Sequence, residues 1–264
     1  MLYAAEDRGH QEGYELVRRI HPDVQLRLQE DRLPLKTQLR DLVRSDRREF
    51  FSFFVDDIVA VAPFGWWDRP FSLLRSRRDI AALSLRLNPE VNYCQPLDIQ
   101  TPPPRLDSDL TWDWTRSRSR LKRLKHRLLG RSRARGDWAG SMFVDGYVFR
   151  HAEFIDYFDA LPEIPHITKL EPVMLDQPLP GRRVVCYPQS RIVNVALNRV
   201  DAHSRYPHGG SSPESLNAHF LAGGRLAYDH LGNLHGNRTC HVVVEPRWQA
   251  DAALRAARDS IVER

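Results

Sequence analysis

The feature that most constrains the fold is residues 50–64, FFSFFVDDIVAVAPF, in which an aromatic-rich apolar run stops at two adjacent carboxylates, Asp56 and Asp57. A near-continuous apolar run of this length is typical of a strand buried on both faces, as in the central sheet of an α/β protein. Two acids at the end of such a strand are costly to bury unless they hold a cation. The run therefore predicts either a cation site at the mouth of the strand or a turn with solvated acids.

The elements predicted on both sides of this run alternate between strands and helices. The alternation favours an α/β fold with a mixed central sheet flanked by helices. We expect one domain over residues 1–248, followed by a C-terminal helix at 249–264. The pattern predicts strands at 2–5, 80–87, 184–188, 192–197 and 240–246, and helices at 6–20, 35–42, 71–78, 151–161 and 213–222.

Hydropathy and cysteine usage indicate where the protein works. No apolar run in the 264 residues reaches the roughly 18–20 residues that a membrane helix needs. The first ten residues lack the basic and apolar regions of a signal peptide. Three widely spaced cysteines read as reduced thiols. We therefore expect a cytoplasmic protein.

The net charge of +5 is concentrated in residues 116–135, which carry ten Lys and Arg and no acid. The rest of the chain is therefore mildly acidic, at about −5. Leucines recur in this basic insert at helical spacing, which fits an amphipathic element lying on an anionic membrane at the inner face. An anionic acceptor, a nucleic acid (which we favour less) and a solvated loop without a partner are the alternatives.

Six segments, in this order, resemble bacterial glycosyltransferase-like proteins with a GT-A fold, over about residues 50–248. They are FFVDDIVAVAPF, LSLRLNPEVNYC, DWAGSMFVDGYVFR, IVNVALNRVDAHSR, SPESLNAHFLAGG and TCHVVVEP. The resemblance implies a GT-A-like, Rossmann-type sheet and a divalent cation, Mn²⁺ or Mg²⁺. It also implies transfer of a sugar from a nucleotide-sugar donor, such as a UDP- or GDP-sugar, to a hydroxyl acceptor.

The acidic pair is the metal-site candidate in this family pattern. We expect Asp57 to bind the metal directly and Asp56 to contact the sugar or water. A cation there neutralises the charge that builds on the leaving diphosphate. His241, which opens the last predicted strand, is a candidate further ligand, because an imidazole suits Mn²⁺. The alternative for His241 is a hydrogen-bonded structural residue.

Asp145 is the candidate general base. It follows an apolar run and precedes Gly146, whose missing side chain would let a substrate come close. One carboxylate is needed to take the proton of the acceptor hydroxyl as that oxygen attacks the sugar. Glu171 is a second candidate acid for catalysis. The simpler interpretation of Asp145-Gly146 is a turn between two strands.

Five further residues are candidates for contacts with the donor or the acceptor. Arg86 and Asn88 lie at a predicted strand end, where Arg86 would pair with a phosphate or form a salt bridge within the fold. Trp112, Trp114 and Trp138 flank the basic insert. Their rings would serve as platforms for a sugar or a base, or as hydrophobic anchors.

Two other functions compete with sugar transfer. The first is a non-catalytic GT-A-like protein that binds an anionic partner, a membrane or a nucleic acid, through residues 116–135. The second is a metal-dependent phosphoesterase that uses Asp56, Asp57 and His241.

Overall fold

The chain divides into two compact units, each built from segments that are distant in the sequence. The computed structural model describes residues 1–5, 7–30, 32–45, 48–117, 136–197, 209–228 and 238–262. The first unit comprises residues 1–33, 196–231 and 243–264, and the second comprises residues 34–195 and 232–242. The single domain expected over residues 1–248 includes parts of both units. Most of the basic insert, residues 118–135, lies outside the described residues.

The first unit is held together by helices from the two ends of the chain. Helix α1 (Arg8–Ile20) packs against α7 (Pro213–Leu221) and α8 (Ala252–Val262). Two small sheets accompany them, one of parallel strands β1 (Leu2–Tyr3) and β2 (Arg27–Leu28). The other is antiparallel and joins β12 (Gly224–Leu226) to β14 (Trp248–Ala250).

The start of α7 follows from local sequence signals, as predicted. Pro213 occupies the first turn, where its missing N–H has no helical partner to lose. The side chain of Ser212 accepts a hydrogen bond from the Ser215 backbone N–H at 3.1 Å, which satisfies one of the free donors of the first turn.

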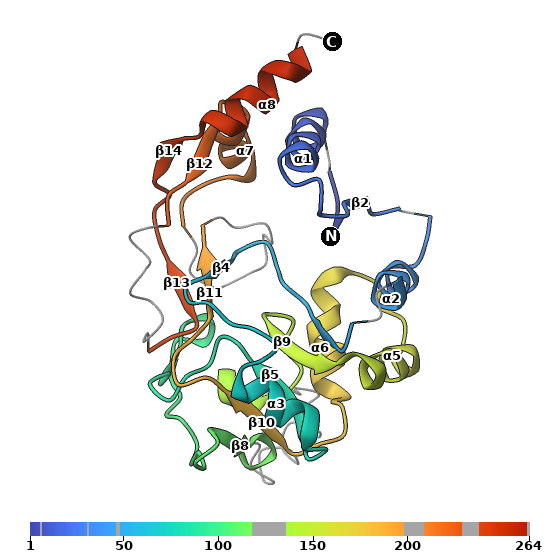
Figure 1. The fold of residues 1–264 in the computed structure, drawn as a ribbon, viewed down its shortest axis with the longest axis vertical. Coiled ribbons are helices and arrows are strands. Elements are labelled where there is room, and N and C mark those ends of the chain that lie inside the picture. Colours follow the sequence, from blue (N-terminus) through green and yellow to red (C-terminus); the bar gives the residue numbers. More distant parts are fainter. Residues whose placement is uncertain are drawn as a thin grey trace. The chain divides into compact units, whose positions relative to one another are not determined.

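A five-stranded sheet in the order β3-β9-β5-β10-β8 forms the second unit's centre (Figure 1). Its parallel pair is β5 with β10, and its other pairs are antiparallel, so the sheet is mixed. This confirms the predicted mixed α/β architecture. In sheet order the strands are Phe50–Ser52, Tyr147–Arg150, Ile80–Ser84, Arg183–Cys186 and Thr111–Asp113.

Helices cover both faces of this sheet. Successive residues of a strand point to opposite faces, and the rings of Phe50 and Phe51 show which helix covers each face. Phe50 meets Phe71 of α3 (Arg69–Ser76), with ring centroids 5.1 Å apart. Phe51 stacks on Phe154 of α5 (His151–Ala160), with centroids 4.9 Å apart. Helix α2 (Leu35–Ser45) packs in turn against α5.

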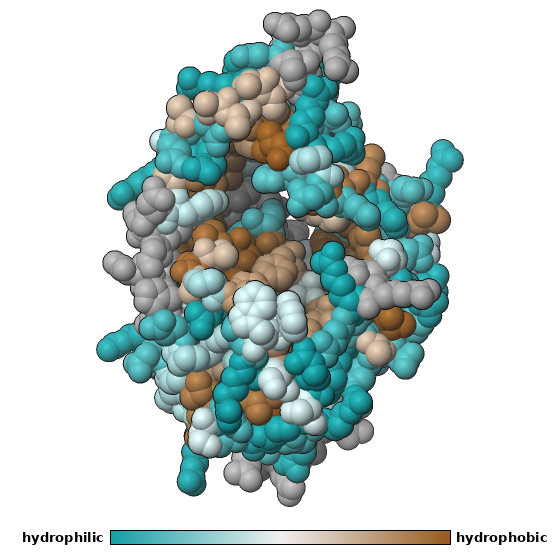
Figure 2. Space-filling view, in the orientation of Figure 1, coloured by the Kyte–Doolittle hydropathy of each residue, from teal (hydrophilic) through white to brown (hydrophobic). Residues whose placement is uncertain are grey.

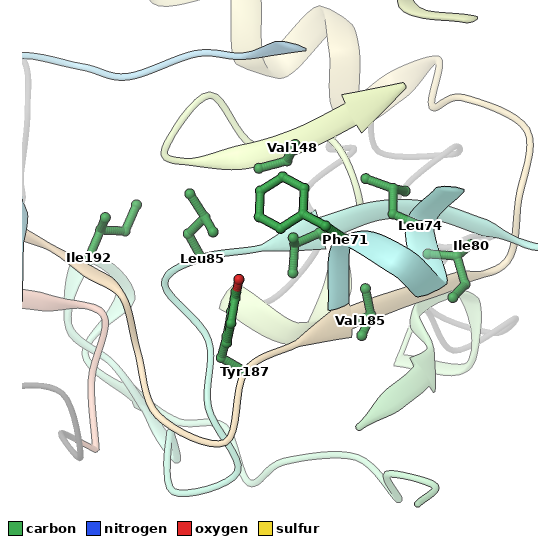
Figure 3. Packing of buried hydrophobic residues seen from close by; sticks show 9 residues of the cluster. Phe71, Leu74, Ile80, Leu85, Val148, Val185, Tyr187 and Ile192 are labelled. Carbon is green, nitrogen blue, oxygen red and sulfur yellow. The ribbon is translucent and has the colours of Figure 1, made fainter. Parts of the chain in front are cut away.

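The core under α3 is apolar. Phe71 and Leu74 of the helix meet side chains from β5, β9 and β10 and from the loops that follow β5 and β10 (Figure 3). Every residue of β5 is buried. The members of this core cluster are Phe71, Leu74, Ile80, Leu83, Leu85, Val148, Val185, Tyr187 and Ile192.

Strand β3, which precedes the acidic pair, belongs to this sheet but lies at its edge. Strand β3 ends at Ser52, and Phe54 beyond it is 51% exposed. The centrally placed, fully buried strand is Ile80–Ser84. Its apolar character follows from α3 and α5, which cover both faces of this edge strand.

A second sheet has three strands and includes β4, the strand that directly follows the acidic pair. Its order is β13-β11-β4, with β4 at Ile58–Ala60, β11 at Ile192–Ala196 and β13 at His241–Val243. The remaining elements among the described residues are the hairpin strands β6 (Tyr93–Cys94) and β7 (Ile99–Gln100), helix α6 (Leu170–Asp176) and four short 3₁₀ helices. These are Gln95–Leu97, Trp114–Ser117, Asp137–Ala139 and Ile167–Lys169.

Figure 2 shows hydrophilic residues over most of the face in view, with hydrophobic ones in smaller patches. Among the described helices, none has the length and apolar character needed to cross a membrane.

Candidate functional site

Asp57 lies in the turn between β3 and β4, where the chain passes from one sheet to the other. Strand β11 fixes this turn, because the Val195 backbone N–H donates to the Asp57 carbonyl at 2.7 Å. On the same strand, the Asn194 side-chain amide donates to Asp57 Oδ1 at 3.0 Å. The carboxylate of Asp57 is therefore held by a neighbouring strand, whereas Asp56 beside it is exposed.

Asp145 reaches the same place from the turn before β9. Gly146 makes that turn possible, because its φ of +67° is a conformation that side chains disfavour. An added Cβ there would also overlap Cδ1 of Ile192. The Gly146 N–H donates to the Phe53 carbonyl at 3.0 Å, which ties the turn to the segment before Asp57. The missing side chain thus serves internal packing, and not the close approach of substrate that we expected.

Arg86 lies buried behind Asp145. It donates to Asp145 Oδ2 at 2.9 Å and to Asp137 Oδ1 at 2.8 Å. Its guanidinium also faces the ring of Phe143, 4.7 Å from the centroid. Burial acts to lower the pKa of Arg86, but Asp137 and then Asp145 raise it well above the ordinary value. Of the two fates predicted for Arg86, the structure has the ion pair within the fold, so the predicted phosphate contact is replaced.

His241, the first residue of β13, also lies beside Asp145. Its Nε2 lies 3.8 Å from Asp145 Oδ2, and both side chains are 15% exposed. Its Nδ1 is buried and has no hydrogen-bond partner. Asn194 Oδ1 is a second buried atom without a partner. Buried polar atoms are nearly always hydrogen-bonded, so two such atoms beside the same carboxylates are available to a bound group.

The carboxylates of the site have divergent pKa values. Burial, and then the charge of Asp145, raises the pKa of Asp57 to about 6. Burial, and again Asp145, raises the pKa of Glu171 to about 7. Burial also acts to raise the pKa of Asp145, but the nearby His241 imidazole and the charge of Arg86 outweigh it and lower that pKa. Glu171 is held from α6, where its Oε2 accepts the Val144 N–H at 3.1 Å. A site whose carboxylates have pKa values shifted in opposite directions is suited to proton transfer.

The three predicted tryptophan platforms lie in the interior. Trp112, Trp114 and Trp138 are all buried, and each indole N–H donates to a backbone carbonyl. The rings of Trp112 and Trp138 pack edge to face with centroids 4.8 Å apart. They offer no open ring face to a sugar or a base, which corrects their predicted role in favour of the hydrophobic anchor.

Asn88 also has a structural role in place of the predicted donor contact. It is buried, its amide donates to Ser190 Oγ at 2.7 Å, and its Oδ1 accepts the Glu90 N–H at 2.8 Å. These bonds stabilise the turn after the segment that carries Arg86.

Two residues of the site were missed or undervalued from the sequence. Asn194 was not among the candidate site residues, but its side-chain amide donates directly to Asp57. Asp137 was not singled out, although it is a buried partner of Arg86. The available signal was an acid placed directly before an apolar Trp-Ala pair, where a carboxylate needs a partner if it is buried.

The donor set suits a cation only in part. The described residues include no group of three or more His, Cys, Asp or Glu side chains placed to hold a metal ion. Mg²⁺ is commonly bound by one or two carboxylates plus substrate phosphates, which does not require such a group. Burial, and then the charge of Asp145, raises the pKa of Asp57, and a cation there would favour the ionised carboxylate. The unpartnered Asn194 Oδ1 and His241 Nδ1 are further donors of suitable type.

The structure thus brings together Asp57, Asp145, Glu171 and His241, all within the second unit and from four separate segments. Arg86 and Asn194 hold this group in place. No family model, curated protein or solved structure matches the chain, so what this site does has to be inferred from its own residues.

Proposed function

We propose that this chain is a metal-dependent glycosyltransferase that moves a sugar from a nucleotide-diphosphate sugar to a hydroxyl acceptor. The observation that supports it most is the convergence of Asp57, Asp145 and His241 at one place. These are the residues to which the resemblance assigns the metal and the base. Nothing in the spacing of residues 57, 145 and 241 alone requires them to meet.

Asp57 is the residue that would hold Mn²⁺ or Mg²⁺, with His241 as the further ligand. When bound, the ion supplies positive charge to the diphosphate as it leaves the sugar. Asn194 orients the Asp57 carboxylate through its 3.0 Å hydrogen bond. Asp56 is exposed beside it and would contact the sugar hydroxyls or water.

Asp145 is the proposed base. Arg86 and His241 keep it ionised, so its carboxylate can accept the hydrogen bond of the acceptor hydroxyl. That hydroxyl becomes acidic as its oxygen bonds to the sugar, and its proton then passes to the carboxylate. Glu171 is the second candidate, because a pKa of about 7 suits proton transfer near neutral pH.

Donor binding is the first test. Thermal unfolding is measured with UDP-, GDP-, CMP- and dTDP-sugars, each with and without Mn²⁺. We expect one class of donor to raise the midpoint by about 5 °C at saturation, and only with Mn²⁺. Asp57→Asn should abolish this shift, whereas Asp23→Asn, an exposed acid of the first unit, should keep it. A chain that no donor stabilises would refute sugar transfer and favour the non-catalytic alternative.

Turnover with the donor so found separates the two carboxylates. Asp145→Asn should lower the rate of transfer by about 10²- to 10⁴-fold while leaving the donor-induced shift in place. If Glu171→Gln has that effect and Asp145→Asn does not, Glu171 is the base. Release of phosphate from phosphoesters without sugar transfer would indicate the phosphoesterase instead.

A further inference from the structure

The loop between β4 and α3, residues 61–68, carries two adjacent tryptophans on the surface; it can be followed between these two labels in Figure 1. Trp66 is 65% exposed and Trp67 is 71% exposed, the highest values among the exposed large hydrophobic residues of the described chain. Phe64 beside them is exposed as well. Single exposed apolar residues are ordinary, but adjacent large ones mark a contact surface for a ligand or a partner.

Hydrogen bonds attach the loop that carries these rings to the rest of the second unit. Asp68 Oδ2 accepts the Gly65 N–H at 3.0 Å and the Tyr187 hydroxyl at 2.8 Å. Tyr187 belongs to the apolar core, so the loop is tied directly to the centre of the unit. Pro70 in the first turn of α3 fixes the exit of the loop.

The two rings also pack against each other. Their centroids lie 5.7 Å apart and their planes cross at 77°. Trp67 lies against the backbone of Gly65, because an added Cβ at residue 65 would overlap its six-membered ring. Rigid aromatic rings bind with little loss of conformational freedom, which favours recognition of a weakly interacting ligand.

The charges beside the loop are paired rather than of one sign. Arg69 is 75% exposed and forms an ion pair with Asp109. Arg77 pairs with Asp79 at 2.8 Å and lies 3.6 Å from Asp109. An anionic membrane is attracted by an excess of basic side chains, which these pairs do not provide. Carboxylate and guanidinium groups beside open aromatic rings instead suit a neutral ligand that has both apolar faces and hydroxyls.

We propose that Trp66 and Trp67 form a surface that binds a neutral oligosaccharide. The C–H face of a sugar ring packs on an indole, and the hydroxyls at its rim bond to Asp109 and Arg69. As the docking place of an acceptor, this surface rests on the proposed sugar transfer. The binding itself does not, because it requires neither the donor nor the metal.

The test measures binding of neutral oligosaccharides to the full chain, first on a glycan array and then by titration calorimetry with the best binder. Trp66→Ala and Trp67→Ala should each weaken binding by about tenfold or more. Gly65→Ala keeps both indoles but displaces that of Trp67, and should weaken binding as well. Tyr228→Ala removes an exposed aromatic ring of the first unit and should leave binding unchanged. Circular dichroism checks that each variant is folded.

Three results would overturn the proposal. The first is a wild-type chain that binds no neutral glycan, or binds one equally well without the two rings. The second is binding to phosphatidylglycerol vesicles that the tryptophan variants lose, which would make the surface a membrane contact. The third is a dimer that these variants dissociate. The variants should still show the donor-induced thermal shift with Mn²⁺, so loss of glycan binding and failure of the proposed transferase are read separately.

Discussion

Two regions of the second unit are buried to a similar degree but are stabilised by different interactions. Under α3, the side chains of Leu74, Leu83 and Val185 pack in a cluster made almost wholly of carbon. Just past the end of the same central strand, Arg86 lies as deeply buried between two carboxylates. The apolar cluster stabilises the fold by removing surface from water, roughly 1.5–3 kcal/mol for each large side chain. Charges gain no such term on burial, and their desolvation is offset only while every partner stays in place.

The difference indicates why each region exists. A stable fold needs the first region, and hydrophobic residues of similar volume would often serve equally well in place of the second. His241 and Arg86 keep Asp145 ionised, and burial together with the charge of Asp145 raises the pKa of Glu171 and Asp57, which a merely structural core does not require. The proposed sugar transfer would explain this cost.

The largest expected effect comes from removing the shared cation. Arg86→Met leaves Asp137 and Asp145 buried without their partner, and should lower the free energy of unfolding by about 3–5 kcal/mol. Arg75→Met is the matched control, because Arg75 pairs with Glu49 on the surface and its loss should change stability by no more than about 1 kcal/mol. Denaturant unfolding measures both. Equal effects would show that the buried cluster does not depend on its cation.

The second effect is a dependence of folding stability on pH. Its sign should differ between Glu171, whose pKa the fold raises, and Glu153, whose pKa the fold lowers. The fold raises the pKa of Glu171 from 4.5 to about 7, so it favours the protonated carboxyl. The stabilisation from this group is fully present below about pH 4.5 and is lost as the pH rises through about 7. Glu171→Gln keeps an oxygen that accepts the Val144 N–H. Because Gln does not ionise, the variant should not lose stability as the pH rises. At about pH 9 the variant should exceed the wild type by up to roughly 3 kcal/mol, and at about pH 4 the two should match.

Glu153 provides the opposite sign as a control for this prediction. Burial acts to raise its pKa, but hydrogen bonding from Arg150 and then from Arg78 outweighs it and lowers that pKa. The stabilisation from Glu153 is therefore present at neutral pH and lost in acid. Glu153→Gln should destabilise the chain at about pH 7 and approach the wild type as the pH falls below about 4. If both Gln variants respond to pH in the same direction, the assigned environments are wrong.

How far the sequence could predict this arrangement depends on the range of each interaction. Local signals were sufficient for β5 and for the capped helix α7, because periodicity and capping act within a few residues. They could not place β3 at the edge of the sheet, since α3 and α5 cover both its faces. Nor could they foresee the two units, because α1 packs against α7 and α8 from the far end of the chain.

The candidate site shows the same limit. The order of motifs singled out Asp57, Asp145 and His241, which the fold brings together. It could not decide between the two fates of Arg86, because the deciding partners Asp137 and Asp145 arrive from a distant segment. The choice between platform and anchor for the tryptophans at 112, 114 and 138 was undecided for a similar reason. An indole can be buried when its N–H donates to a carbonyl, as that of Trp112 does. The position of that carbonyl depends on the tertiary fold and cannot be predicted from the sequence.

The smallest expected effect lies where the two regions meet. Ile192 belongs to the apolar cluster, and its Cδ1 fills the space left by the missing side chain of Gly146, next to Asp145. Ile192→Val deletes that methyl group and should cost about 1 kcal/mol. The loss should be the same at about pH 4 and about pH 9, because methyl burial involves no proton. Chemical unfolding at the two pH values measures it. A cost that changes with pH would show that the methyl group acts through the position of the Asp145 turn, and that apolar packing and the ionic cluster are one cooperative structure rather than two.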